Sequence, residues 1–393
     1  DTDAFRLDAL IAAGEHFFSE QPADWIPRFD AFRKEHAAWL DDYALFIAIK
    51  HHHQARPWMQ WPDGLRRREN KALDKARKDY AEKIRQVCFE QFVFFTQWHE
   101  IRDYARQHGV LLFGDMPIFV SHDSADVWAC SKNFLMDDEG EAAFVAGVPP
   151  DAFSDTGQRW GNPLYDWDYM LKDNFSWWRM RFRTQLELFD LIRVDHFRGF
   201  EACWQIPDGE ETAINGEWVQ VPGRALLQSL FDEFDNLSLV AEDLGIITEE
   251  VTRLRTDFNL PGMKILQFAF GGDNKNPYLP HNHETISVVY TGTHDNDTTL
   301  GWFNSLDDHT INHIKAYLGL GNDTQLDMPW DFNRLALQSV ARLAVLPLQD
   351  VLSLDESHRM NTPGTTEDNW QWRYEEGVLT PELAARLYDM LAL

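Results

Sequence analysis

Short apolar runs that end in or just before a polar, often acidic, residue recur along the chain. They constrain its fold more than any other feature. Each run has the length of a buried strand and is followed by a segment of helical or loop character. The six runs cover residues 110–115, 191–195, 237–243, 263–270, 287–290 and 345–350. Strands that alternate with helices favour a parallel α/β fold, and the topology we expect is a (β/α)8 TIM-type barrel with helical and loop insertions.

Four of these runs place a carboxylate at or just beyond the end of the strand: Asp115, Asp195, Glu242 and Asp295. Parallel strands carry their C-terminal ends to one face, so we expect these side chains to converge on one mouth. Clustered carboxylates repel, which costs stability unless chemistry needs them. Retaining glycosyl transfer needs one ionised and one protonated carboxyl group, about 5–5.5 Å apart. A divalent-metal site also prefers clustered carboxylates, and spacing alone leaves it open.

The run that contains Asp195 also carries an arginine. Side chains alternate along a strand, so Leu191, Arg193 and Asp195 should share one face while Ile192 and Val194 share the other. A face with an Arg/Asp pair must open onto water or onto a polar site. The alternative is a structural ion pair at the end of a strand.

The first 108 residues have a different pattern, with apolar residues at three- and four-residue spacing between charged ones. This spacing predicts helices over residues 38–50 and 71–106, joined by a loop. We therefore expect residues 1–108 to form a helical subdomain and residues 109–393 to supply the barrel strands. The consecutive histidines at 51–53 point in different directions on a helix, so we interpret them as a helix end rather than a metal site.

Composition limits the function. The formal net charge of −28 argues against nucleic acid or anionic membranes as partners. No apolar run is long enough to span a membrane, and the first residues do not resemble a signal peptide. The three cysteines are widely spaced and suggest neither a disulfide framework nor a zinc site, so we expect a reducing, cytoplasmic location.

A long connection follows Asp115 and reaches to about residue 177. Its central part, residues 147–165 within a segment of about 140–165, mixes turn-forming residues with amides and aromatic side chains. Such a segment is typical of an active-site lid. The alternative is a surface loop whose aromatic residues, Phe153 and Tyr165, pack into the core.

Long motifs in this chain resemble the amylomaltases, which are the 4-α-glucanotransferases or disproportionating enzymes of glycoside hydrolase family 77 in the α-amylase superfamily. The resemblance extends over nearly the whole chain. The motifs that carry it cover residues 114–120, 157–165, 192–199, 241–245 and 291–297.

The resemblance implies specific roles. Asp195 would be the nucleophile, steadied by Arg193, and Glu242 the general acid and base. Asp295 would bind the hydroxyls of the distorted sugar ring, with His294 beside it. Substrate contacts would also come from Asp115, Asp151, Gln158, Trp160 and Asn361. The implied reaction transfers α-1,4-glucan segments between maltooligosaccharides without a cofactor or a required metal.

Two departures from the family pattern stand out. Where relatives carry an aromatic pair in the lid, this chain has Ala152 and Phe153. The family also has a segment before residue 1 that supplies two barrel strands, and we count six strands where a closed barrel needs eight. We therefore expect this chain to lack the first two strands, and an N-terminal segment of the same polypeptide is an expected partner.

Three other functions remain as alternatives. An α-1,4-glucan hydrolase would use the same three carboxylates, Asp195, Glu242 and Asp295. A non-catalytic glucan-binding protein would need these acids to be remnants. A metal-dependent hydrolase is the least favoured, because no histidine is spaced to join the acids as a ligand.

Overall fold

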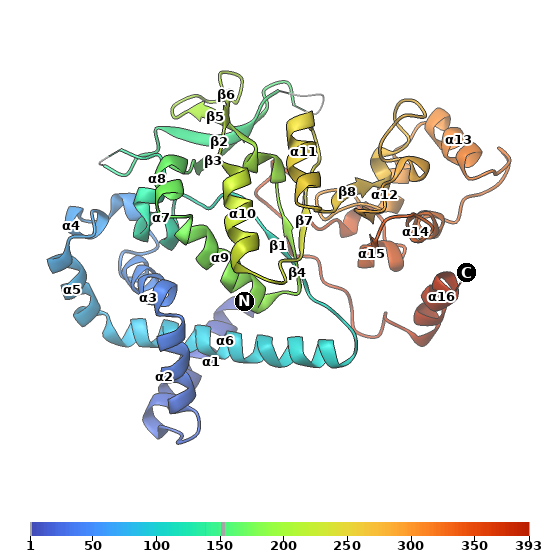
Figure 1. Cartoon of the computed structure of the whole chain (residues 1–393). Helices are drawn as coiled ribbons and strands as arrows, with labels where there is room; N and C mark the ends of the chain where they lie inside the picture. Colours follow the sequence, from blue (N-terminus) through green and yellow to red (C-terminus); the bar gives the residue numbers. More distant parts are fainter. Residues whose placement is uncertain (1, 138, 151–153, 393) are drawn as a thin grey trace. The chain divides into compact units, whose positions relative to one another are not determined.

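The computed structural model describes residues 2–137, 139–150 and 154–392. The chain divides into two compact units, residues 1–238 and 239–393, and each is described by itself. Helices and parallel strands occur in both units, so the predicted α/β fold is confirmed (Figure 1). Within the described ranges, no helix combines the length and apolar character needed to cross a membrane.

The first unit begins with helices, as predicted. Its helical elements are α1 (Thr2–Glu20), α2 (Ile26–Glu35), α3 (Ala37–His52), η1 (Trp58–Gln60), α4 (Asp63–Arg66), α5 (Asn70–Asp79) and α6 (Ala81–Gln107). The long helix α6 packs against α1, α2 and α3 around buried aromatic residues that include Phe29 and Phe92 (Figure 1). The helix predicted over residues 71–106 is interrupted at Tyr80, and the histidine run lies at the end of α3, as expected.

A titratable cluster joins α6, the junction between α2 and α3, and a later helix, α9 (Ser176–Leu188). Glu187, near the end of α9, lies 3.5 Å from Nε2 of His36 and 3.4 Å from Nε2 of His99 on α6. Burial raises the pKa of Glu187 from 4.5 to about 7, and the negative charge of Glu35 adds to the effect. The pKa of His36 is lowered, mainly by its own burial. Both shifts favour the neutral forms of these side chains in the folded protein.

The raised pKa of Glu187 makes stability depend on pH. Between about pH 4.5 and 7 the folded state holds a proton that the unfolded state has lost, so stability should fall as pH rises through this window. The shift corresponds to at most about 3 kcal/mol. The lowered pKa of His36 makes stability rise with pH instead, so the test compares the pH dependence of a Glu187 variant with that of the parent. Thermal midpoints measured from pH 5 to 8 should fall less steeply in Glu187→Gln than in the parent, and equal slopes would contradict the assignment. Glu35→Gln should give an intermediate slope.

A parallel strand pair positions the charged residues of the first unit. β1 (Phe113–Met116) pairs with β4 (Leu191–Val194), with Asp115 opposite Arg193. Ile192 and Val194 are fully buried, which explains why this stretch forms a strand. β1 begins later than the run from residue 110 predicted, because Val110 and Leu111 are exposed.

An antiparallel sheet occupies much of the region that the sequence analysis interpreted as a loop. Its strands are β2 (Phe144–Val148), β3 (Gln158–Pro163), β5 (Ala202–Pro207) and β6 (Glu217–Gln220), in the order β3-β2-β5-β6. Gly147 allows β2 and β3 to approach closely, since a Cβ atom there would lie 2.2 Å from the carbonyl oxygen of Gln158. Tyr165 is buried, so its aromatic ring does pack into the core. The remaining elements of this unit are α7 (Ala125–Ala129), η2 (Ser131–Asn133), α8 (Trp167–Lys172), η3 (Phe197–Phe200) and α10 (Gly223–Glu233).

The second unit contains a three-stranded parallel sheet with the order β10-β9-β8. The sheet consists of β8 (Gly262–Ile265), β9 (Ser287–Tyr290) and β10 (Leu343–Val345), and the unit also contains the strand β7 (Leu239–Ala241). Its helices are α11 (Glu249–Asp257), η4 (Leu266–Phe268), η5 (Pro280–Asn282), α12 (Thr299–Asn304), α13 (Asp308–Tyr317), α14 (Trp330–Leu337), α15 (Leu348–Val351), η6 (Glu356–His358) and α16 (Pro381–Leu391).

Two strand predictions in this unit were partly wrong. The run at 263–270 is strand only as far as Ile265 and then turns into η4. The run at 345–350 meets β10 only at Val345, because Pro347 caps the start of α15. The first run is mostly buried and the apolar residues of the second are half-buried, and a short apolar run alone does not distinguish a strand from a helical turn.

Candidate active site

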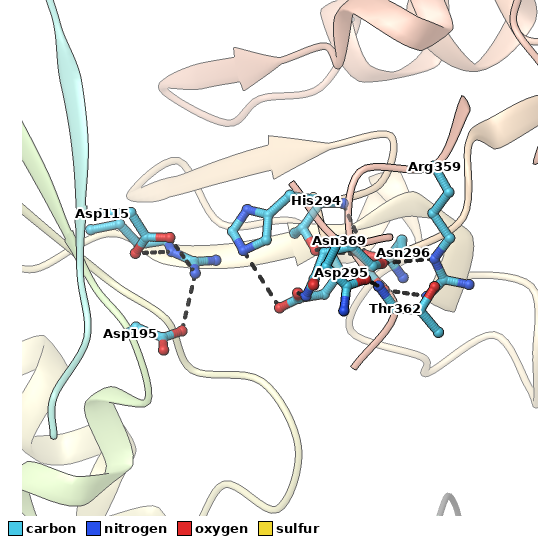
Figure 2. Close-up of polar contacts among 11 residues, drawn as sticks. Asp115, Asp195, His294, Asp295, Asn296, Arg359, Thr362 and Asn369 are labelled. Atoms are coloured by element: carbon cyan, nitrogen blue, oxygen red, sulfur yellow. Dashed lines mark hydrogen bonds and ion pairs between the residues drawn. The ribbon is translucent and has the colours of Figure 1, made fainter. Parts of the chain in front are cut away.

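Arg193 binds two carboxylates at once. Its Nε and one Nη donate to the two carboxylate oxygens of Asp115 at 2.8 and 2.7 Å, and the same Nη donates to Asp195 at 3.0 Å (Figure 2). Arg193 is buried, whereas about two fifths of each carboxylate side chain is exposed. The buried cation holds both carboxylates by charge-assisted hydrogen bonds, and the pair predicted on one face of the strand is in direct contact.

His196 follows Asp195 and was not singled out from the sequence. Its backbone is left-handed, with φ at 51°, which turns the chain away from the strand direction directly after the carboxylate. Burial lowers the pKa of His196 to about 4, and Arg198 adds to the effect. Because it is neutral, His196 adds no second positive charge beside Asp195. Its only signal in the sequence was its position next to an acid.

Trp160 and Gln158 lie on β3. The ring of Trp160 is 4.9 Å from that of His196 in an edge-to-face contact, which brings it near Asp195. Its indole Nε1 donates to the side-chain oxygen of Gln158 at 3.1 Å, and both residues are exposed. Two residues predicted to contact substrate therefore lie together on a strand. Asp151, together with the departures at 152 and 153, lies outside the described residues.

Asp295 is the centre of a polar cluster in the second unit. One carboxylate oxygen accepts a hydrogen bond from Nδ2 of Asn361 at 2.6 Å, and the other lies 3.5 Å from Nε2 of His294 (Figure 2). Arg359 donates to the backbone carbonyl of Asp295 at 2.6 Å. The ring of Trp370 lies 4.9 Å from that of His294. The cluster brings together three residues predicted for the site, and adds Arg359 and Trp370, which the sequence analysis did not select.

Glu242 directly follows β7, and its environment differs from that of its neighbour Asp243. One oxygen of Glu242 accepts a hydrogen bond from the backbone N–H of Leu244 at 3.0 Å. The Asp243 side chain is 11% exposed, accepts from the N–H of Met263 at 2.7 Å and lies 3.1 Å from Nε of Arg255. Burial still raises the pKa of Asp243. Asp243 is therefore a structural acid, whereas Glu242 is half-buried and accepts a hydrogen bond from the backbone of Leu244.

The spacing of the clustered acids left a divalent-metal site open as an alternative. Among the residues that the structure describes, no group of three or more His, Cys, Asp or Glu side chains is arranged to hold a metal ion. The acids of the first unit are instead joined through Arg193, and Asp295 is joined to an amide and an imidazole. Such sets bind neutral polar groups through hydrogen bonds.

Comparison with known proteins identifies the family. A family model described as 4-alpha-glucanotransferase matches residues 2–380. A 4-alpha-glucanotransferase from Thermus thermophilus is 49% identical over 98% of this chain and 78% of its own length. One from Synechocystis is also 49% identical, over 98% of this chain and 76% of its own.

A solved structure agrees with these matches. The amylomaltase from Streptococcus agalactiae in complex with acarbose is 35% identical, with a TM-score of 0.92 over 98% of this chain and 78% of that one. The match by sequence and the match by structure both extend over nearly all of the described residues, so the chain belongs to the 4-alpha-glucanotransferase family.

Proposed function

We propose that this chain transfers α-1,4-glucan segments between maltooligosaccharides by retaining double displacement. The observation that carries the proposal is the contact of Arg193 with both Asp115 and Asp195. A buried guanidinium places a positive charge beside the Asp195 carboxylate and fixes its orientation, as a nucleophile requires. Asp115 accepts from Nε and from the same Nη of Arg193 and holds the guanidinium in place.

The reaction has two steps. In the first, a carboxylate oxygen of Asp195 attacks C1 of the donor sugar while Glu242 gives a proton to the departing 4-oxygen, so that the glycosidic bond breaks as an ester bond forms. In the second, Glu242 takes the proton from the 4-hydroxyl of the acceptor, which attacks C1 and releases Asp195. Two inversions restore the α configuration.

Asp295 stabilises the transition state in this proposal. Its carboxylate is oriented by Asn361 and lies beside His294, so it can accept hydrogen bonds from adjacent ring hydroxyls. Such bonds gain strength as positive charge develops on the distorted ring. His294 and Asn361 provide further polar atoms for the same sugar.

We also propose that the chain follows the (β/α)8 barrel topology. The α1–α6 region would form a helical subdomain ahead of the third barrel strand, and residues 140–165 would cover the site.

Transfer is favoured over hydrolysis when the site binds the acceptor sugar well and limits the access of water. Trp160 offers a flat face for a sugar ring and Gln158 offers an amide, which suits them to hold an acceptor.

The products formed from pure maltotriose test this proposal. Transfer keeps the number of glycosidic bonds constant, so we expect glucose and a ladder of longer maltooligosaccharides with a nearly constant total of reducing ends. Chromatography of the products, alongside a reducing-end assay, distinguishes the outcomes. A steady rise in reducing ends without a ladder would indicate a hydrolase, and binding without turnover would indicate a binding protein. Trp160→Ala should raise the hydrolysed fraction, with Trp218→Ala as a matched control on the same antiparallel sheet.

A further inference from the structure

The segment that carries His294 and Asp295 is held at both ends by one carboxylate. It runs from Thr291, just after β9, to Thr299, the first residue of α12. Asp350 accepts hydrogen bonds from the hydroxyl of Thr291 at 2.5 Å and from the hydroxyl of Thr299 at 2.6 Å, both through Oδ2. Its Oδ1 accepts the backbone N–H of Thr299 at 2.8 Å. A single side chain thus joins two points that are eight positions apart.

Asp350 cannot act by touching a sugar. Its exposed fraction is 1%, and both threonines are fully buried. It lies on α15, where Asn333 of α14 donates to its backbone carbonyl at 3.3 Å. The position of Asp350 is therefore set by the core of the second unit, and any effect on the reaction must pass through the 291–299 segment.

The residues between the two ends are held by further hydrogen bonds within the segment and to Gln267. Asn296 accepts from the N–H and hydroxyl of Thr293, and Asp295 N–H donates to the same hydroxyl. Gln267 donates to the carbonyl of Asp297 at 2.9 Å. These bonds fix the shape of the turn around Asp295, but the three bonds to Asp350 fix where the turn begins and ends.

We propose that Asp350 is a positioning residue for Asp295, acting by holding both ends of the segment at a fixed separation. The inference rests on the proposed role of Asp295. A carboxylate is suited to this task because it accepts all three hydrogen bonds and donates none. An asparagine of the same shape cannot accept all three bonds. With its oxygen toward the Thr299 N–H, its NH2 group faces the two hydroxyls, which must then accept instead of donate; turned the other way, the NH2 group opposes the Thr299 N–H and that bond is lost.

Four variants test the proposal: Asp350→Asn, Thr299→Val, Thr299→Ser and the control Ser339→Ala. Thr299→Val removes one hydroxyl, and Thr299→Ser restores it. Ser339→Ala removes a different buried contact in the same unit, the 2.7 Å bond to His283, which is remote from the segment in the chain. Rates are measured with maltotriose well below the thermal midpoint of each variant, so that unfolding does not enter.

Displacement of Asp295 should weaken the binding of the transition state more than the binding of the substrate. We expect Asp350→Asn and Thr299→Val to lower kcat by about 10- to 100-fold with KM changed less than about threefold. Thr299→Ser should remain within about twofold of the parent. Ser339→Ala should lower the thermal midpoint and leave kcat unchanged.

The proposal is overturned if folded Asp350→Asn and Thr299→Val keep the kcat of Ser339→Ala, or if Thr299→Ser loses as much activity as Thr299→Val. If Asp350→Asn does not fold, the two Thr299 variants decide alone. Asp295→Asn separates this inference from the role proposed for Asp295. Full activity in Asp295→Asn would refute that role, whereas an inactive Asp295→Asn with an unaffected Thr299→Val would refute the positioning role alone.

Discussion

Asp195→Ala should lower kcat by at least about three orders of magnitude, while maltooligosaccharide binding persists. Losing a covalent nucleophile removes the route through the glycosyl-enzyme, which corresponds to roughly 4 kcal/mol or more of barrier lowering. The variant should fold, because Asp195 is partly exposed and Arg193 keeps both of its bonds to Asp115. Single-turnover kinetics and calorimetric titration with maltotriose measure the two effects separately.

Asp190 provides a matched control for this variant. It is an acid of the same region, but its side chain is 7% exposed and bound to Arg102 and Arg106. Asp190→Asn should lower stability through these contacts and leave kcat close to that of the parent. Turnover of Asp195→Ala within tenfold of the parent would refute the nucleophile assignment, and an equal loss in both variants would indicate a structural effect.

Glu242→Gln should lower kcat with natural glucans by about 10²- to 10⁴-fold, which is the usual contribution of a general acid. Glutamine keeps an oxygen to accept the N–H of Leu244, so the local fold should persist. The loss should depend on the donor. With a maltosyl fluoride as donor, the departing fluoride ion needs no proton, so the first step should recover most of the parent rate. The second step still lacks its base, so the glycosyl-enzyme should accumulate.

Mass spectrometry of the protein after mixing with the fluoride detects that accumulation. Asp243→Asn is the control, because Asp243 is adjacent in the chain but is bound to Arg255 and Met263 N–H. It should lower the thermal midpoint and affect both donors equally. An equal loss with fluoride and glucan in Glu242→Gln would argue against a role in protonation.

The sequence predicted features that depend on local patterns. The strand at residues 287–290 was predicted with its observed bounds, because all four residues of β9 are buried and the last three form an apolar run. The contact of Arg193 with Asp195 followed from alternation along one strand. The helices before residue 108 followed from their periodic spacing.

Features that depend on distant pairing were not predicted. The antiparallel sheet joins β2 to β5 across about 60 residues, and its strands lie among turn-forming residues that suggested a loop. Arg359 and Asn361 contact Asp295 from more than 60 positions away, so spacing carried no information about them. Asn361 was found through resemblance alone, and Arg359 was not found at all. The pattern of one segment cannot reveal which remote segment will supply its hydrogen-bond partners.

The placement of Gln158 and Trp160 on β3 has a consequence for how specificity could change over evolutionary time. β3 pairs with β2, and β2 pairs with β5, so the two side chains move with a sheet rather than with a free loop. Under the proposed function, acceptor binding then rests on β3 whereas the nucleophile follows β4, so the two tasks lie on separately mutable elements of the chain. Laboratory selection for new acceptors should therefore find changes at Gln158 and Trp160 that leave the rate of the first step unchanged.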